Sequence, residues 1–503
     1  MASVPCNAEV ALETEPRLIM EQHFYRFRSI DALLGRHAEL EAQEIYFASP
    51  AQLNDPMEGF KNLYWQGDEI VWRALFKNYL FCMMKSLTMV MLQGEGFDKS
   101  SCEGFVHQTD ADLPDAPIRQ IYAGICEAFF AQSVVGDLIR MLATSSAKVR
   151  HDELGCYLRA LNPFAFTLSK DALMPRLGEE NSGLALDAQG DAVERQNLRA
   201  LAKIIKQRAE TADDEVDLTF EVNARAAMQV KLINHINNTR TPLQRAWMFF
   251  AADFVDFYIR SLENLVHPAW YAACFVAAPN NASMWGSYAD GHKGMCLKFA
   301  SKLNTEGQPT LSLYRAVAVG GGRENIKTHF AYSPLTFEAV RYGDPHPEIN
   351  FFSTLGTVPM GKLSFWYAGP DGRQSGNASG PLSEKDDWRQ SYWENYHAGR
   401  VTKTGDWEHE AEHRLILDAS FDQPRLLKYQ FKDLTGICFG IKTSDEDKIR
   451  VIRIIEEKCR KERRPDFEFY QARYSNYTKT IEIVLLRLLK VDLNAPSLAA
   501  SQG

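Results

Sequence analysis

The spacing of apolar and polar positions changes twice along the 503 residues. Short apolar runs separated by turn residues occupy residues 23–60 and return from Trp270 onward, which is typical of strands. Between them, residues 61–265 carry apolar positions at helical spacing. These helical stretches are 68–92, 116–143, 191–209, 224–237 and 243–265. The pattern predicts an α+β fold, in which a split domain with a mixed or antiparallel sheet is interrupted by a large all-α insertion.

The segment 270–299 is the most informative part of the predicted sheet domain. It reads as an apolar strand at 270–276, a short aromatic helix at 284–288, a turn with the sequence DGHKG and a second strand at 295–299. Loops at the edge of a sheet often carry the side chains that contact ligands. We therefore expect five side chains to lie together at one edge: Trp285, Tyr288, Asp290, His292 and Lys293.

The remaining boundaries follow from the same pattern. A strand is predicted at 337–342, a helix at 350–363, a loop at 369–381, a helix at 445–460 and strands at 467–474 and 480–488. The predicted domains are a tail at 1–20, a sheet domain at 21–60 plus 266–490, the helical insertion at 61–265 and a second tail at 491–503.

Composition and charge narrow the class of protein. A hydrophobic fraction of 45% and a charged fraction of 24% are typical of globular proteins. The net charge of −9 argues against a protein that coats nucleic acid or an anionic membrane. The nine cysteines form no CxxC pair, and no apolar run is long enough for a membrane span. We expect a cytoplasmic protein with reduced thiols and no membrane partner.

Four blocks of sequence resemble one bacterial family. They are YRFRS at 25–29, IYFASPAQLNDPMEG at 45–59, CFVAAPNNASMWGSYADGHKGMCLKF at 274–299 and DWEHEAEHRLIL at 406–417. Their order and spacing are similar to those of the domain of unknown function 2971, and the segment FGIKTSDEDKIRVI at 439–452 also fits. The helical insertion lies outside this resemblance.

The order of residue types is also similar to that of ADP-ribosyltransferases. In that class an early strand carries Arg or His, a middle element carries an aromatic residue, and a late strand carries a glutamate. The resemblance implies NAD as the cofactor, with a carboxylate that holds a ribose hydroxyl, an aromatic ring that stacks on nicotinamide and a cation that meets the pyrophosphate. On this hypothesis the catalytic residues are Glu412, Glu410 and His292, and the NAD-binding residues are Tyr25, Arg28, Asn54, Trp285, Tyr288 and Arg414.

The segment His409 to His413 also matches H-E-x-x-H, the helical signature of zinc proteases. That signature requires an α-helix that places both histidines on one face. The flanking sequence instead predicts a strand, with Glu410, Glu412 and Arg414 on one face and the histidines on the other. We predict no metal here.

Two further interpretations stay open from the sequence alone. Asp55, Glu58, Glu410 and Glu412 supply enough oxygen ligands for the divalent cation of a nuclease. Glu410, Glu412 and Arg414 also suit a structural charge network, and the protein is then open to a non-enzymatic role as a ligand-binding or interaction module of a defence system. As a transferase or a nuclease, we expect it to be an effector of toxin or phage-defence type that acts on a macromolecular target. The inserted helices would then bind a partner, form a lid or mediate oligomerisation.

Overall fold

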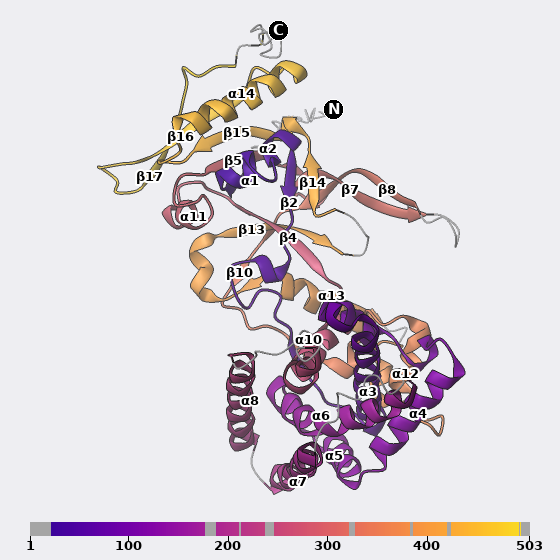
Figure 1. Cartoon of the computed structure of the whole chain (residues 1–503). Coiled ribbons are helices and arrows are strands. Elements are labelled where there is room, and N and C mark those ends of the chain that lie inside the picture. The colour runs from indigo at the N-terminus through magenta and orange to yellow at the C-terminus, as the bar shows by residue number, and fades with distance from the viewer. Residues whose placement is uncertain are drawn as a thin grey trace, which may run out of the picture. The chain divides into compact units, whose positions relative to one another are not determined.

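The computed structural model describes residues 22–176, 188–210, 213–236, 246–320, 327–382, 386–419, 424–491 and 493. It has an α+β fold, as the sequence predicts. The chain divides into two compact units (Figure 1). We call residues 1–58, 270–344 and 403–503 the α+β unit, and residues 59–269 and 345–402 the helical unit.

An eight-stranded sheet forms the centre of the α+β unit. Its order is β17-β16-β15-β5-β1-β4-β13-β9, and β15 and β16 are its parallel pair. The strands are β1 (His23–Arg28), β4 (Trp270–Val276), β5 (Met295–Ala300), β9 (Glu338–Ala339), β13 (Glu412–Asp418), β15 (Leu434–Phe439), β16 (Glu468–Tyr474) and β17 (Ile481–Leu485). The early strand β1 thus lies between two strands that follow it by more than 240 residues.

A second, antiparallel sheet packs against the first. It has the order β2-β14-β7-β6, and β8 pairs with β7. Its strands are β2 (Glu44–Tyr46), β6 (Lys302–Leu303), β7 (Pro309–Gly320), β8 (Lys327–Thr336) and β14 (Leu426–Tyr429). Apolar side chains of both sheets and of helix α14 (Asp445–Glu462) form one buried core. Short helices α1 (Ile30–Leu34) and α2 (Glu39–Ala42) connect β1 to β2.

The opposite face of the large sheet carries helix α11 (Ala282–Ser287). Asn281 caps this helix because its side chain accepts hydrogen bonds from the backbone of Ser283 and Met284. Phe27, Trp285 and their neighbours form a separate small core on this face. In the strand register, Tyr25 lies opposite Val276, which in turn lies opposite Glu412. Directly opposed residues share a face, so Tyr25 and Glu412 are on the same side of the sheet as α11.

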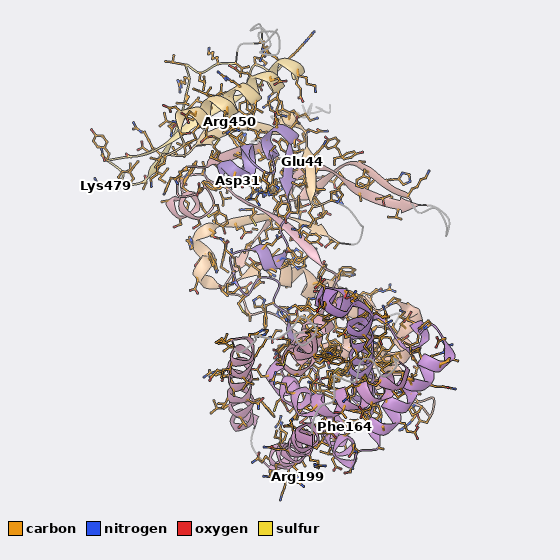
Figure 2. The ribbon with its side chains drawn as sticks, in the orientation of Figure 1. Asp31, Glu44, Phe164, Arg199, Arg450 and Lys479 are labelled. Atoms are coloured by element: carbon orange, nitrogen blue, oxygen red, sulfur yellow. The ribbon has the colours of Figure 1, made fainter. Side chains whose placement is uncertain are left out.

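The helical unit is built around one large apolar core. Its longer helices are α3 (Glu69–Gln93), α4 (Ala116–Phe130), α5 (Ser133–Thr144), α6 (His151–Leu173), α7 (Ala188–Glu210), α8 (Asp213–Ile236), α10 (Phe254–Leu262) and α13 (Asp386–Val401), with the short α12 (Leu363–Tyr367). A one-turn π-helix at Phe249–Asp253 precedes α10, and β3 (Asn62–Tyr64) pairs with β11 (Glu348–Asn350). Figure 2 labels Phe164 inside this bundle, where it is buried.

Several buried polar groups in this core bond to one another. The Tyr79 hydroxyl donates to Asn162 Oδ1 at 2.6 Å, and Asn162 Nδ2 donates to the carbonyl oxygen of Phe250 at 2.7 Å. Tyr258 donates to Asn78 Oδ1 at 3.1 Å. Such pairing removes the cost of burying the amides and fixes how α3, α6 and α10 pack.

Several predicted elements differ from the structure. Residues 345–402 belong to the helical unit, because Phe351, Phe352 and Trp366 pack in its core. The predicted helix at 350–363 is instead mostly 3-10 turns and irregular chain. The predicted helix at 224–237 starts earlier in the structure, because α8 begins at Asp213. The predicted tails at 1–20 and 491–503 lie almost entirely outside the described residues.

Within the described residues, no helix combines the length and the apolar character that crossing a membrane requires. The eight cysteines in this part of the chain carry free thiols.

Candidate functional site

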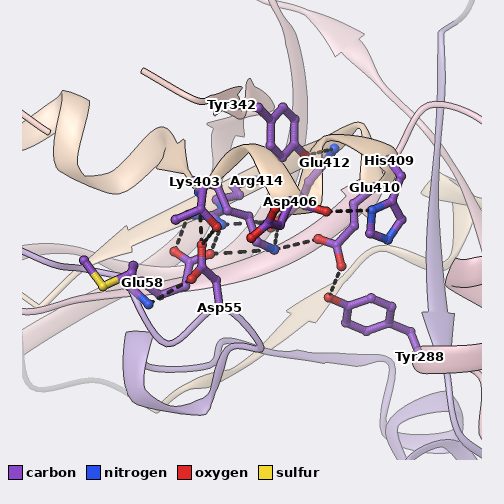
Figure 3. A network of polar contacts seen from close by, with 12 residues as sticks. Asp55, Glu58, Tyr288, Tyr342, Lys403, Asp406, His409, Glu410, Glu412 and Arg414 are labelled. Atoms are coloured by element: carbon purple, nitrogen blue, oxygen red, sulfur yellow. Dashed lines mark hydrogen bonds and ion pairs between the residues drawn. The ribbon is translucent and has the colours of Figure 1, made fainter. Parts of the chain in front are cut away.

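Three segments that are far apart in the sequence meet at one polar cluster of the α+β unit (Figure 3). The loop after β2 contributes Asp55 and Glu58, Tyr288 is the residue that follows helix α11, and residues 403–414 supply the remaining charged groups. We define the carboxylate cluster as Glu58, Lys403, Glu410, Glu412 and Arg414, with Tyr288 and Tyr342 bonded to it.

The Asn54-Asp55-Pro56 turn positions Glu58. The Asp55 carboxylate accepts hydrogen bonds from the backbone N–H of Met57 at 2.9 Å and from the N–H and hydroxyl of Thr404, each at 3.1 Å. Burial alone would raise the pKa of Asp55, but these bonds and the charge of Lys403 lower it. Asp55 is therefore an ionised clamp that ties the early loop to the residue after Lys403.

Arg414 lies at the centre of the cluster and is fully buried. Its Nε donates to Glu412 Oε1 at 2.8 Å, its Nη1 donates to Glu58 Oε2 at 2.9 Å, and its Nη2 donates to both carboxylates. Strands β13 and β4 hold it, because Arg414 lies opposite Cys274 in the register. A bidentate guanidinium–carboxylate pair of this kind fixes orientation as well as charge.

The two carboxylates bound by Arg414 have pKa values shifted in opposite directions. Burial raises the pKa of Glu58 despite the opposing charge of Arg414. Burial would also raise the pKa of Glu412, but Arg414 and Lys403 outweigh it and hold the pKa at about 2. Glu412 is thus firmly ionised, and two cations are required to keep it so.

Lys403 holds the second pair of contacts. Its Nζ donates to Glu410 Oε2 at 2.6 Å and to Glu412 Oε2 at 3.3 Å, and lies 4.7 Å from the centroid of the Trp407 ring. Burial opposes its charge, but the glutamates raise its pKa. The ammonium is therefore shared between two buried carboxylates and an aromatic face.

Half-buried aromatic residues border the buried charges. The Tyr288 hydroxyl donates to Glu410 Oε1 at 2.7 Å, and the Tyr342 hydroxyl accepts from the backbone N–H of Glu412 at 2.8 Å. Burial raises the pKa of both phenols, that of Tyr342 to about 12, and Glu410 further raises that of Tyr288. Tyr288, Tyr342 and Trp407 each keep part of their surface exposed.

The three glutamates of the cluster differ in the partners of their carboxylate oxygens. Every carboxylate oxygen of Glu58 and Glu412 contacts a buried cation. Glu410 instead has one oxygen on Lys403 and the other on the half-exposed Tyr288. Displacing the Tyr288 hydroxyl would therefore leave one oxygen of Glu410 without a partner, whereas the oxygens of Glu58 and Glu412 all contact cations.

A second triad of the same composition lies elsewhere on this sheet. Lys298 Nζ donates to Glu468 Oε2 at 2.9 Å and to the Tyr470 hydroxyl at 3.0 Å, and that hydroxyl donates to Glu468 at 2.5 Å. Tyr25 lies opposite Lys298 in the register. The two triads match in composition and differ in burial, since the Glu468 side chain is 39% exposed and that of Glu410 is 2% exposed.

The structure brings together only part of the predicted site. Glu410, Glu412, Arg414 and Tyr288 belong to the carboxylate cluster, and Tyr25 lies on the same sheet face. Trp285 is fully buried, with its indole N–H donating to the Pro279 carbonyl at 2.7 Å and its ring edge-on to Phe27. This ring has no face open for stacking on a ligand.

Arg28, Asn54 and His292 are not members of the carboxylate cluster. Arg28 forms an ion pair with Glu39, on the opposite sheet face from Tyr25. Asn54 is exposed in the turn. His292 has a positive φ of 72°, and its buried Nδ1 has no hydrogen-bond partner among the described residues. Burial and the charge of Lys442 lower the pKa of His292.

Sequence reasoning did not select Lys403 or Tyr342. Lys403 lies just before the DWEHEAEHRLIL block, and Tyr342 is the last residue of a predicted strand. The sequence does place Lys403 close to Glu408, Glu410 and Glu412. Since a buried carboxylate needs a cationic partner, this proximity could have identified Lys403 as part of the site.

The H-E-x-x-H segment does not form an α-helix. Residues Gly405–Glu410 form a 3-10 helix, Ala411 adopts a left-handed conformation with φ of 45°, and β13 begins at Glu412. The predicted strand therefore starts later than expected, and Glu410 reaches the cluster from the turn. His413 instead lies edge-on to Phe24, in contact with the other core.

Among the residues that the structure describes, no group of three or more His, Cys, Asp or Glu side chains is arranged to hold a metal ion. Of the four acidic groups that a nuclease would use for a metal, Glu58, Glu410 and Glu412 form ion pairs with Lys403 or Arg414. The fourth, Asp55, accepts hydrogen bonds from Met57 and Thr404.

Comparison with known proteins gives no relative. No protein-family model, curated protein or solved structure matches the chain. The resemblance to the domain of unknown function 2971 stays a prediction.

Proposed function

We propose that the α+β unit binds NAD at the carboxylate cluster and transfers ADP-ribose to a macromolecular target. The observation that carries the proposal is the position of Glu410, a buried carboxylate joined to the surface by the half-exposed Tyr288. The order of residue types along the chain, similar to that of ADP-ribosyltransferases, supports the same conclusion.

The chemistry requires one available carboxylate. Transfer breaks the bond between the ribose C1′ and the nicotinamide nitrogen, and the ring leaves with the electron pair. A nucleophile of the target forms the new bond to C1′ and releases its proton. Glu410 would accept a hydrogen bond from a ribose hydroxyl and stabilise the positive charge that develops on the sugar.

The residues present fit such a ligand in two respects. Tyr288, Tyr342 and Trp407 offer partly exposed aromatic surface beside the cluster. Lys403 and Arg414 hold Glu412 ionised, and the same Lys403 ammonium bonds Glu410, which fixes the Glu410 carboxylate in place for a ribose hydroxyl. In this proposal Glu412 and Arg414 position Lys403 and Glu410, and Glu410 meets the substrate.

The test compares two isosteric substitutions in chemically matched triads. Glu410→Gln removes the charge from the Tyr288–Lys403 triad, and Glu468→Gln does the same in the Tyr470–Lys298 triad. We expect the wild-type chain to release nicotinamide from NAD, Glu410→Gln to lose at least tenfold in rate, and Glu468→Gln to retain the rate. Liquid chromatography measures nicotinamide, and circular dichroism checks that each variant is folded.

If both variants lose the same fraction of the rate of nicotinamide release, the loss comes from a broken ion pair in general. That result would contradict a specific role for Glu410. Absence of nicotinamide release with a bacterial lysate as target would contradict the transferase. Tyr288→Phe is a further test, because it removes the hydroxyl that bonds Glu410 Oε1 and keeps the aromatic ring. We expect this variant to lower the KM for NAD.

A specific observation favours one second candidate, a ligand-binding module without catalysis. All oxygens of the three cluster glutamates already have partners, which is the arrangement of a structural network. Such a module would be stabilised thermally by NAD without releasing nicotinamide. The free thiols of the described cysteines support a cytoplasmic setting for either candidate.

A further inference from the structure

Helix α8 carries apolar side chains on the face turned away from its own unit. Leu218, Val222, Leu232 and Ile236 are between 57% and 72% exposed. A surface helix of a globular protein usually carries polar residues there. Figure 1 shows α8 at the edge of the helical unit.

The inner face of the same helix accounts for its packing. Phe220 is buried and lies edge-on to Tyr157 of α6, with ring centroids 5.5 Å apart. Farther along, Lys231 Nζ lies 2.8 Å from an oxygen of Asp253. Positions 220, 224, 227 and 231 thus face the unit at helical spacing. The exposed apolar residues are not needed to hold α8 in place.

The outer residues follow the repeat of a coiled coil. Along the outer face the positions are Leu218, Val222, Arg225, Gln229, Leu232 and Ile236, and all six are exposed. Their spacings are 4, 3, 4, 3 and 4, which is the a and d pattern of a heptad. Four of the six positions are apolar, as the a and d positions of a helix pair require. Met228, Val230 and Ile233 are further exposed apolar residues of α8 outside this row.

The repeat is symmetric about its own midpoint, which specifies the orientation of a pair. In an antiparallel pair of two copies, Leu218 meets Ile236, Val222 meets Leu232, and Arg225 meets Gln229. Apolar residues then face apolar residues, and each guanidinium faces an amide oxygen that accepts a hydrogen bond. A parallel pair would instead place the two Arg225 side chains opposite each other and repel.

We infer that a second copy of this chain docks on α8, forming a twofold antiparallel helix pair through Leu218, Val222, Arg225, Gln229, Leu232 and Ile236. Glu221, which pairs with Arg225 along the helix, keeps that guanidinium at the face. The inference is independent of the proposed function, since it uses only the helical unit.

The size of the contact sets the expected strength. A 24-residue helix is about 36 Å long and 10–12 Å wide, so contact along its length covers on the order of 400 Å² per copy. Standard stable interfaces cover about 800 Å² per partner. We therefore expect a dimer that dissociates on dilution.

Analytical ultracentrifugation of the full chain tests the inference. From about 1 to 100 μM, the wild type should shift from a mass of 57.0 kDa toward twice that value. Val222→Glu/Leu232→Glu should stay monomeric throughout. Val230→Glu, an exposed position about 100° around the helix from the stripe, should dimerise like the wild type. Since all three positions are exposed, none of these changes removes a core contact.

Cysteine cross-linking tests the orientation. Residues 218 and 236 are about 27 Å apart along the helix, so an antiparallel pair joins them only between copies. The double variant Leu218→Cys/Ile236→Cys should give a covalent dimer on oxidation, and Leu218→Cys alone should match the wild-type background. A wild type that stays monomeric, a dimer that survives Val222→Glu/Leu232→Glu, or efficient cross-linking of Leu218→Cys alone would each overturn the inference.

Discussion

Arg414 shows how one residue organises the carboxylate cluster. Its guanidinium contacts Glu58 from the early loop and Glu412 from its own strand, and all three are buried. Burying ions costs several kcal/mol each unless they are well paired. The cluster is therefore a place where the loss of any one charge leaves an uncompensated ion in the interior.

The low pKa of Glu412 makes the stability of the α+β unit depend on pH. Its folded pKa of about 2 lies below the ordinary value of 4.5, so its contribution is complete above about pH 4.5 and is lost as the pH falls toward 2. Glu58 acts in the opposite sense because its pKa is raised. We expect Glu412→Gln to lower the thermal midpoint at pH 7, and the gap from wild type to narrow between pH 5 and pH 3.

A matched control is available on the helical unit. Glu348 also has a pKa of about 2, through hydrogen bonds to Lys148 and Arg150, but it is exposed. Molar salt should suppress the effect of Glu348→Gln and leave that of Glu412→Gln largely intact. A gap for Glu412→Gln that does not change between pH 5 and pH 3 would contradict the assignment. Calorimetry measures both.

At the scale of elements, alternation predicted the faces of the early strand. Tyr25 and Phe27 share the α11 side of β1, as the HFYRFR pattern indicates. The turn before β13 was not predictable in the same way, because Ala411 adopts a left-handed conformation that alanine rarely takes. Propensity would favour continuing the strand or the 3-10 helix, and tertiary contacts of Glu410 and Glu412 override it.

At Ala411 a change from alanine to glycine is expected to stabilise the protein, which is the opposite of its usual effect. A left-handed conformation costs an L-residue about 1–2 kcal/mol, and glycine avoids this cost while losing about 0.5–1 kcal/mol of chain entropy. We expect Ala411→Gly to raise the unfolding free energy by about 0.5 kcal/mol. Ala273→Gly, in the buried middle of β4, should lower it. Thermal or urea unfolding measures the unfolding free energy of both variants. An Ala411→Gly variant less stable than the wild type would contradict the cost assigned to the left-handed conformation of Ala411.

At the scale of the whole molecule, the sequence predicted the α+β fold with a helical part but not the second helical segment. Strands resume after residue 265, and residues 345–402 were assigned to the sheet domain for that reason. Their aromatic residues, such as Phe352 and Trp366, carry no mark of which core they join. Whether an aromatic residue joins the core of the helical unit or that of the α+β unit depends on contacts with residues far away in the chain, and a single sequence does not show those contacts.

The helical unit and the α+β unit have separate cores, so we expect them to respond separately to mutation. Asn162 bonds both Tyr79 and Phe250 inside the helical unit, so Asn162→Leu should lower the stability of that unit by about 1–3 kcal/mol by leaving buried polar groups unpaired. Calorimetry should resolve two transitions, of which Asn162→Leu lowers one and Glu412→Gln the other. A single transition moved equally by both variants would show that the units unfold as one.

The position of β1 has a consequence for how the protein is made. This strand is synthesised more than 240 residues before its partners β4 and β5, which follow at 270–300. At about 5–20 residues per second, β1 waits on the order of 10–50 s with both edges unpaired. During that interval most of the helical unit is synthesised, and the carboxylate cluster must wait longer still for residues 403–414. We expect nascent chains of this protein to depend on chaperones that shield exposed strand edges.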